Sequence, residues 1–435
     1  MMKRAFLGVA VFSATFAFAE QSMTFEHLLE MMEQSSPKLE QQRLQTKIAQ
    51  QSLRSAEAAY LPSLALGATS EYSHKFNDTV TPSYVGSDSL TQTSQYQNSS
   101  TISLTYDLFR FGATNLGVKA AHQQIKGSKA AECVNLKEQL DSLLEAYAKV
   151  RIATAKLAYY QKMQQLYQES YIMAKRLNEA GELPQTEVIN YAQYIADQLV
   201  MIAQIHEEKE SMLAHLSYLS GIKLDTFSTL EPLHVKESSL TQVSFEESSR
   251  AKQAYAGIEQ KEAQLQAEKT RYLPVFSLYG KYDLYGSDEE QFRRSTQDIE
   301  RNGYRVGLSF SWTIFDGFAR EAAVETRLLE LQQAKMALVE AQRTYEKEQY
   351  LLQAQARERE QRLNSAKRSE ASSHNVSEMI ETLHENGQKD KLSSLKAQIQ
   401  YYQTAIASNE AEELLSLSHT KEILFAQKEY ECAAH

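Results

Sequence analysis

The chain has 435 residues, a formal net charge of −10 at pH 7, 15 glycines and 6 prolines. So few glycines and prolines disfavour an all-β fold and suit long uninterrupted helices, while the excess of acidic side chains argues against a nucleic-acid partner. The two cysteines, Cys133 and Cys432, are too few for a structural metal site or a disulfide framework, so we expect incidental thiols.

The first 19 residues are typical of a secretory signal peptide. Lys3 and Arg4 are basic, residues 5–16 are mostly apolar, and residues 17–19 fit a small-x-small cleavage site. The apolar run is too short to span a bilayer, and no cysteine follows it to carry a lipid. We therefore expect export from the cytoplasm of a bacterium, with no membrane-spanning helix in the rest of the chain.

One helix-to-strand pattern then occurs twice. Residues 24–60 are rich in good helix formers, with a break expected at Ser35-Ser36-Pro37. Leu61-Pro62 ends this helix, because the residue before a proline is pushed out of the α region. The pattern recurs where a helix that begins near Phe245 ends at Leu273-Pro274.

Four segments alternate between apolar and polar residues, as expected of strands with two different faces. They cover about residues 63–74, 101–109, 275–285 and 304–314, and polar loops at roughly 75–100 and 286–303 connect them in pairs. Each segment is about ten residues long, which is enough for a tilted strand to cross a bilayer, and the alternation is typical of outer-membrane barrels. The residues expected in interfacial aromatic girdles are Tyr106, Tyr282, Tyr304 and Trp312. A soluble amphipathic sheet packed on a core would show the same alternation.

A strand that leads into a very long helix also occurs twice, at a constant offset. Phe109 and Phe315 are 206 residues apart, and so are Gly181 and Gly387, where the helices are expected to end. The stretch from Phe109 to Gly181 would reach roughly 100 Å as a helix, which no globular core requires. Helical periodicity continues after each glycine, so we expect two antiparallel helical hairpins with coiled-coil packing.

The repeat divides the chain into five segments. We expect residues 1–19 to be the signal peptide, 20–221 the first repeat, 222–242 a linker, 243–428 the second repeat and 429–435 a C-terminal tail. Four strands cannot close a barrel, for which about eight are needed, and lipid does not tolerate open sheet edges. A membrane-spanning sheet therefore requires several copies, and three chains would supply about 12 strands and four chains about 16.

Short motifs at the junctions and turns resemble those of a known family. They are Tyr60-Leu61-Pro62 and Tyr272-Leu273-Pro274, residues 108–112 and 314–318, and the turns at residues 178–181 and 384–387. Each motif alone is weak, but together, in order and twice, they make the chain similar to the TolC-like outer membrane efflux proteins over nearly all of its mature length.

The resemblance implies an α+β membrane protein. It would be a homotrimer with a 12-stranded β-barrel in the bacterial outer membrane, four strands coming from each chain. A long α-helical coiled-coil barrel would continue into the periplasm, with an equatorial belt near residues 222–242 and the C-terminal tail. The family members are passive exit ducts of tripartite efflux pumps or type I secretion systems. The implied partners are a periplasmic adaptor (membrane fusion) protein and an inner-membrane RND or ABC transporter.

Four residues near the two tip glycines are the candidate periplasmic gate. By position from each glycine, the resemblance assigns this role to Thr186 and Glu187 in the first repeat, and to His384 and Lys389 in the second. An exposed link between Glu187 and Lys389 would contribute only about 0–1 kcal/mol, and the alternative is that all four are ordinary solvated tip residues. His384 replaces an aromatic phenol of the family, which makes pH-sensitive gating a hypothesis.

A second departure concerns the entrance of the duct. The type protein of the family narrows its entrance with aspartates, but the matching positions here are Ser393 and Lys396. Asp390 lies nearby and is a candidate substitute. Cation selectivity of the entrance is therefore left open.

A periplasmic coiled-coil adaptor or scaffold is the alternative function, because such a protein would also contain helical hairpins. The lipid-type alternation of the four strands favours the duct, since an adaptor does not need it. No Gly-rich phosphate loop, metal-ligand cluster or nucleophile motif points to an enzyme, and we expect no cofactor.

Overall fold

A computed structural model describes residues 23–73, 95–226, 228–233, 244–299 and 301–426, with side chains to residue 423. The chain divides into two compact units, which we describe separately. The helical unit comprises Met1–Gln42, Glu132–Ser248 and Thr344–His435, and the strand unit comprises Arg43–Ala131 and Ser249–Arg343. The predicted signal peptide at residues 1–19 and the predicted tail at 429–435 lie outside the described residues.

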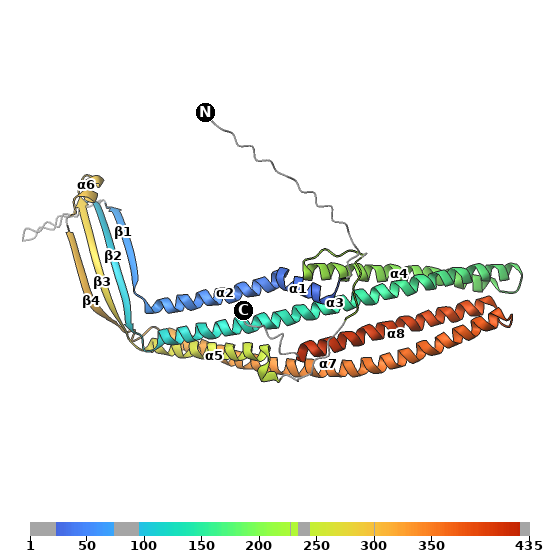
Figure 1. Cartoon of the computed structure of the whole chain (residues 1–435). Coiled ribbons are helices and arrows are strands. Elements are labelled where there is room, and N and C mark those ends of the chain that lie inside the picture. Colours follow the sequence, from blue (N-terminus) through green and yellow to red (C-terminus); the bar gives the residue numbers. More distant parts are fainter. Residues whose placement is uncertain (1–22, 74–94, 227, 234–243, 300, 427–435) are drawn as a thin grey trace, which may run out of the picture. The chain divides into compact units, whose positions relative to one another are not determined.

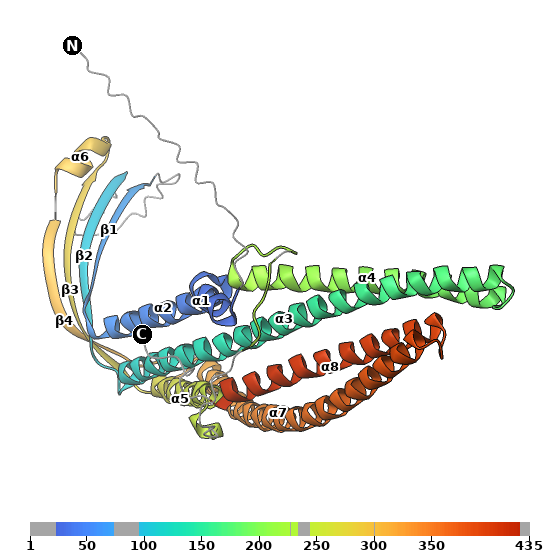
Figure 2. The same ribbon diagram turned by 45° about the vertical axis from the view of Figure 1, so that its right-hand side comes forward.

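The strand unit contains one antiparallel sheet in the order β1-β2-β3-β4. The strands are β1 (Ser63–Tyr72), β2 (Tyr96–Phe109), β3 (Val275–Asp288) and β4 (Arg301–Ser311). Figure 1 shows them side by side, and Figure 2 shows that the sheet is curved. Four strands are therefore confirmed, and each pairs with its neighbour in the sequence.

The strand ends differ from those predicted by alternation. The sheet continues into the predicted polar loops, where Tyr96 of β2 lies opposite Asp288 of β3, because backbone hydrogen bonding does not require apolar side chains. The short helix α6 (Phe292–Gln297) occupies the middle of the second predicted loop. Trp312 and Ile314, which we had expected in the fourth strand, lie beyond its last residue.

The register gives the sheet one apolar face and one polar face. Leu66 lies opposite Ile102, and Leu278 lies opposite Leu308. On the other face Asp283 accepts hydrogen bonds from Thr101 Oγ1 at 2.8 Å and from Arg305 Nη2 at 2.6 Å. The predicted alternation is thus confirmed up to a β-bulge between Asp107 and Phe109, which places Phe109 opposite Phe276.

Each repeat enters the sheet in the same way. Helix α2 (Pro37–Glu57) ends in a 3-10 turn at Ala58–Tyr60, and helix α5 (Ser249–Lys269) ends in a 3-10 turn at Thr270–Tyr272. Leu61 and Leu273 then take extended conformations before their prolines. The repeated proline motif therefore forms the helix-to-strand junction that the sequence predicts.

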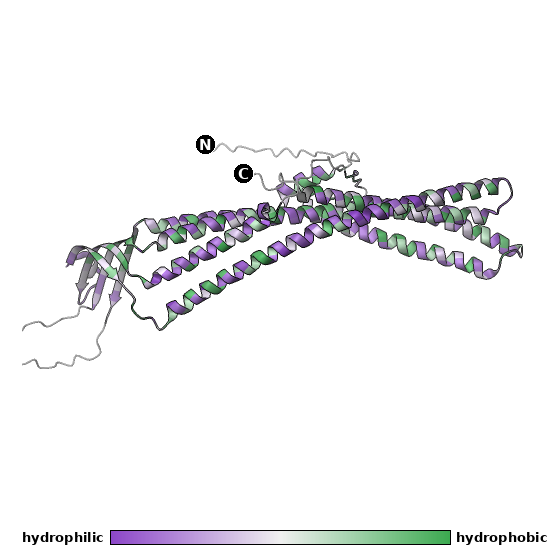
Figure 3. Cartoon of the chain, turned by 90° about the horizontal axis from the view of Figure 1, so that it is seen from below, coloured by the Kyte–Doolittle hydropathy of each residue, from purple (hydrophilic) through white to green (hydrophobic). Residues whose placement is uncertain are grey.

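The helical unit is built on two antiparallel pairs. Helix α3 (Ala113–Glu179) lies beside α4 (Gln185–Ser220), and α7 (Ala319–Glu385) lies beside α8 (Lys391–Ala426) (Figures 1 and 2). Polar and apolar residues are mixed along all four helices (Figure 3). Within the described residues, no helix combines the length and the apolar character that crossing a membrane requires.

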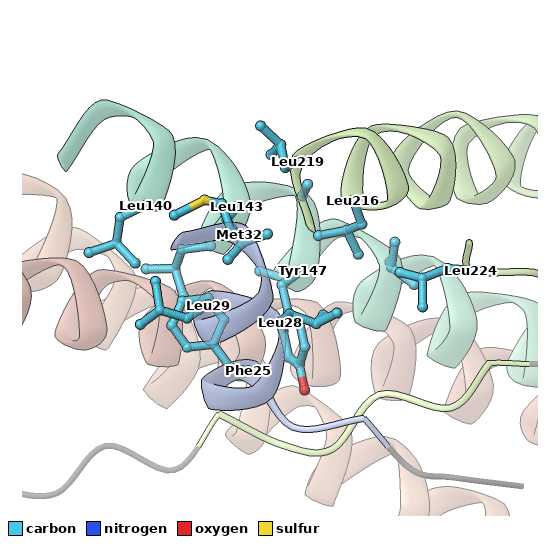
Figure 4. Packing of buried hydrophobic residues seen from close by; sticks show 14 of the residues in the cluster. Phe25, Leu28, Leu29, Met32, Leu140, Leu143, Tyr147, Leu216, Leu219 and Leu224 are labelled. Atoms are coloured by element: carbon cyan, nitrogen blue, oxygen red, sulfur yellow. The ribbon is translucent and has the colours of Figure 1, made fainter. Parts of the chain in front are cut away.

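The main core of this unit lies where α1 (Phe25–Ser35) packs against α3 and α4 (Figure 4). The ring of Phe25 meets that of Tyr147 edge to face at 5.6 Å. The Tyr147 hydroxyl lies 3.0 Å from the Met23 carbonyl and 2.7 Å from the Glu231 carbonyl, both acceptors. Burial raises the pKa of this phenol, so it remains a donor. The segment after α4 is thereby held against the start of the described chain, and Met23 also pairs with Leu230.

A row of ion pairs joins α3 to α8. Arg151 on α3 binds Glu413 on α8 through two hydrogen bonds, one of them Nε to Oε2 at 3.0 Å, and its Nη1 donates to the Leu230 carbonyl at 2.8 Å. Lys156 lies 3.0 Å from Glu410 in the same row. The two hairpins therefore meet partly through charges.

The expectation of an incidental thiol is wrong for Cys133. It is disulfide-bonded rather than an incidental thiol, and the chain has a single other cysteine, Cys432, which lies outside the described residues. A disulfide is consistent with an oxidising compartment outside the cytoplasm.

Candidate functional site

The two tip turns of the helical unit have the same backbone geometry. Gly181 has φ +78° and Gly387 has φ +74°, a left-handed conformation that glycine adopts without steric cost. In the first turn the amide of Gly181 donates to Asn178 at 2.9 Å; in the second the amide of Gly387 donates to His384 at 2.9 Å. Both glycines therefore end their long helices, as predicted.

His384 occupies the same place in the second turn as Asn178 in the first. The Asn178 side-chain amide donates to the carbonyl of Leu183 at 2.7 Å, and His384 Nδ1 lies 3.0 Å from the carbonyl of Lys389. A carbonyl only accepts, so Nδ1 donates the proton of this hydrogen bond.

We expect asparagine to replace His384 without loosening the turn. The His384→Asn variant keeps a side-chain donor, whereas His384→Ala removes a hydrogen bond worth about 1 kcal/mol, which corresponds to about fivefold faster amide exchange. Hydrogen–deuterium exchange of residues 385–390 measures this difference. Asn178→Ala is the matched control and should loosen only the first turn. Equal exchange in wild type and His384→Ala would show that the histidine does not hold the turn.

Asp390 caps the N-terminus of α8. Its carboxylate accepts from the Ser393 amide at 2.6 Å and from the Ser393 hydroxyl at 2.9 Å, the hydrogen bonds of a helix cap. The Ser393 amide holds the pKa of the Asp390 carboxyl below its usual range. Asp390 and Ser393 were both considered above for the entrance of the duct. In the structure they are hydrogen-bonded to each other in the turn.

An apolar cluster lies beneath the tip turns. It joins α3, α4 and α8 through Ala174, Val188, Tyr191 and Leu392. Tyr191 is 2% exposed. The Lys396 ammonium lies 5.8 Å from the Tyr191 ring centroid, a cation–π distance.

Charge at this cluster links α4 to α8. The polar contact with Tyr191, followed by the negative charges of Glu187 and Asp390, raises the pKa of the Lys396 ammonium. Burial raises the pKa of the Tyr191 phenol. Lys396 therefore remains charged over the ordinary range of pH, and its ammonium lies over the ring of Tyr191.

The four predicted gate residues occupy the two turns, but only two of them meet. His384 contacts the backbone of Lys389, while Thr186 and Glu187 lie in the first turn of α4. Within the described part of the chain, no hydrogen bond or ion pair joins Glu187 to Lys389, and their link remains a prediction. Tyr191 was not predicted from the sequence, although its position one helical turn after Glu187 was the available signal.

The tip of the helical unit is held by hydrogen bonds and by contacts of charged side chains. In the residues that the structure describes, no group of three or more His, Cys, Asp or Glu side chains is arranged to hold a metal ion. The side chains at the turns form hydrogen bonds and charge contacts that can be broken or exchanged. This arrangement suits a contact surface or a latch.

The sequence of both repeats matches a family of known proteins. Residues 28–220 and 242–418 match the family model described as outer membrane efflux protein. The chain belongs to the outer membrane efflux protein family. This match confirms the predicted family and its outer-membrane location, with helices that reach into the periplasm. It also confirms that this family has no enzymatic role.

Solved channels share the fold at low sequence identity. The outer membrane channel CmeC of Campylobacter jejuni has a TM-score of 0.78 and 14% identity over 92% of this chain and 85% of that chain. VceC of Vibrio cholerae has a TM-score of 0.73 and 17% identity over 92% and 95%. The fold is therefore TolC-like, with four strands and long helices in two repeats.

Among curated proteins, Protein CyaE of Bordetella pertussis is 23% identical over 317 residues. The match covers 70% of this chain and 63% of that protein. The chain thus matches somewhat less than two thirds of the length of this relative.

Proposed function

We propose that the protein is a passive outer-membrane exit duct of a tripartite efflux pump or type I secretion system. Three copies would form a 12-stranded barrel. Its periplasmic tip would be opened by an adaptor protein that works with an inner-membrane RND or ABC transporter. The boundaries at residues 221 and 242 would separate the two repeats from an equatorial linker.

The sheet is the observation that carries this proposal. Its apolar face is exposed, with Leu64 at 72% and Leu308 at 73%. Among the described residues β1 and β4 each pair on one side only, and open edges of this kind are not tolerated in lipid. Pairing β4 of one copy with β1 of the next removes both edges and leaves the polar face toward a water-filled interior.

The tip supports the second part of the proposal, that partners open the duct. Its turns carry weak exposed contacts rather than a packed core, and such contacts are individually worth little. Thr186, Glu187, His384 and Lys389 are the proposed gate residues, and the cluster beneath them adds Lys396. Repetition around a symmetric ring would make several weak links into a latch.

Single-channel recordings test this function. Reconstituted protein should conduct in planar bilayers, and the double variant Glu187→Ala, Lys389→Ala should raise the conductance, because it removes both charges of the proposed latch. Glu182→Ala, Lys391→Ala is the matched control, since it removes one charge of each sign from the same turns. The duct is wrong if wild-type protein gives no channels, whereas unchanged conductance in the double variant rejects only the latch.

A further inference from the structure

The polar face of the sheet carries charged side chains of both signs. On the four described strands these are Glu71, Asp107, Lys281, Asp283, Arg301 and Arg305. They share one face because each lies an even number of residues from Asp283 on β3, or opposite such a position in the register. The charges of this face sum to zero, so the local field depends on where each of them lies.

The basic side chains of this face lie together on β3 and β4. Lys281 is directly opposite Arg305, and Arg301 is opposite Tyr285, four residues further along β3. We call Lys281, Arg301 and Arg305 the basic patch, which extends over about 13 Å of strand. Like charges that face each other on neighbouring strands repel. The stability of the sheet therefore does not explain why Lys281 and Arg305 are paired.

One of the three basic side chains is neutralised by a contact. Arg305 Nη2 donates to Asp283 Oδ2 at 2.6 Å. Arg301 instead lies 5.9 Å from the ring centroid of Tyr285, and Lys281 forms no hydrogen bond or ion pair with any residue that the structure describes. Three basic side chains against one acidic side chain leave two positive charges in excess in this part of the face.

The other acidic side chains of the face lie away from the basic patch. Asp107 accepts a hydrogen bond from Ser277 Oγ at 2.7 Å and lies 3.6 Å from Arg110, at the end of the sheet where β2 leads into α3. Glu71 lies on β1, which pairs with β2 rather than with β3. The excess positive charge is therefore confined to one region of the face.

Small residues leave the basic patch open on β4. Gly303 and Gly307 lie two residues before and two residues after Arg305, on the same face of the strand. The ring of Tyr279 lies against Gly307, where an added Cβ would be 2.8 Å from the tyrosine hydroxyl oxygen. This ring therefore lies along the sheet rather than over the arginine, whose side chain is 68% exposed.

An open patch of like charges acts on passing ions without binding them tightly. In the proposed duct the polar face would surround a water-filled interior, and low-dielectric walls concentrate the field of charges that line them. The Debye length is about 10 Å at 0.1 M salt, which is comparable with the length of the basic patch. Three copies would repeat the patch around one interior, so an ion on this path would not avoid its field.

We propose that the basic patch makes the barrel of the duct favour anionic solutes. This inference rests on the proposed function, since it requires the polar face to line the interior. The class of solute is that of small anions, which includes weak organic acids that are ionised near neutral pH. Composition gives no sign of this preference, because the chain as a whole has a net charge of −10.

Reversal potentials of reconstituted channels in a gradient of potassium chloride, between about 0.01 M and 0.1 M, test the inference. Lys281→Gln should lower the ratio of chloride to potassium permeability about twofold, the factor expected for one unit charge roughly 10 Å from an ion in water. Since Lys281 has no contact partner among the described residues, its substitution breaks no hydrogen bond of the sheet. Lys281→Arg keeps the charge, is the matched control, and should behave as wild type.

Salt separates an electrostatic effect from a change of shape. At about 1 M salt the Debye length falls to about 3 Å. The difference between Lys281→Gln and Lys281→Arg should then disappear, whereas an altered barrel would differ at every salt concentration. A difference of the same size at high salt would therefore overturn the basic patch.

The remaining outcomes separate the inference from the proposed function. Equal reversal potentials for Lys281→Gln and Lys281→Arg at low salt would overturn the basic patch and leave the duct standing, because the residues of the tip are the same in both variants. If neither wild type nor Lys281→Arg forms channels, the duct is wrong and the inference falls with it.

Discussion

Arginine in place of Leu308 is expected to prevent most of the protein from assembling in the outer membrane. Leu308 lies in the middle of the apolar face of β4, opposite Leu278. A charged side chain on the lipid face of a barrel costs about 2–4 kcal/mol near the bilayer midplane, and a symmetric assembly incurs that cost in every copy. The measurement is the amount of detergent-extracted trimer in the outer-membrane fraction.

Ser309→Arg is the matched control for this prediction. Ser309 is the next residue on the same strand and lies opposite Ser277 on the polar face. An arginine there would point into water, so assembly should be close to that of wild type. Equal loss of trimer in both variants would show that the two faces of the sheet do not differ in environment, and lipid contact would be wrong.

Loss of Arg151 is expected to cause the second large effect, a strong destabilisation of the helical unit. The side chains of Arg151 and Glu413 are 16% and 12% exposed, so the Arg151→Ala variant leaves a carboxylate largely buried without its partner. Breaking a buried pair in this way costs about 3–5 kcal/mol. The variant also frees the Leu230 carbonyl that Arg151 binds. Circular dichroism should show a thermal midpoint lower by ~10 °C.

Two further variants show whether burial is the cause. Lys367 and Glu412 also join neighbouring helices, at 3.2 Å, but their side chains are 52% and 59% exposed, so Lys367→Ala should change the midpoint little. The double variant Arg151→Met, Glu413→Leu removes both buried charges and should recover much of the lost stability. A Lys367→Ala midpoint as low as that of Arg151→Ala would contradict this explanation.

The sequence alone determined the parts of the fold that depend on local pattern. Side-chain alternation predicted the apolar and polar faces of the sheet, because the two faces of a strand repeat every two residues. Gly181 and Gly387 marked the helix ends, because their left-handed φ is a local requirement. The junctions Leu61-Pro62 and Leu273-Pro274 marked the strand starts for a similar reason.

Only the tertiary structure decided which distant groups meet. Arg151 and Glu413 are 262 residues apart, and neither carries a local signal that names its partner. His384 forms a hydrogen bond with the Lys389 carbonyl, and this contact defines its role. Lys396 lies over the buried ring of Tyr191, which belongs to another helix. Contacts of this kind depend on how helices pack rather than on the period of any one segment. Alternation and glycine position therefore predicted the elements, and packing assigned the partners.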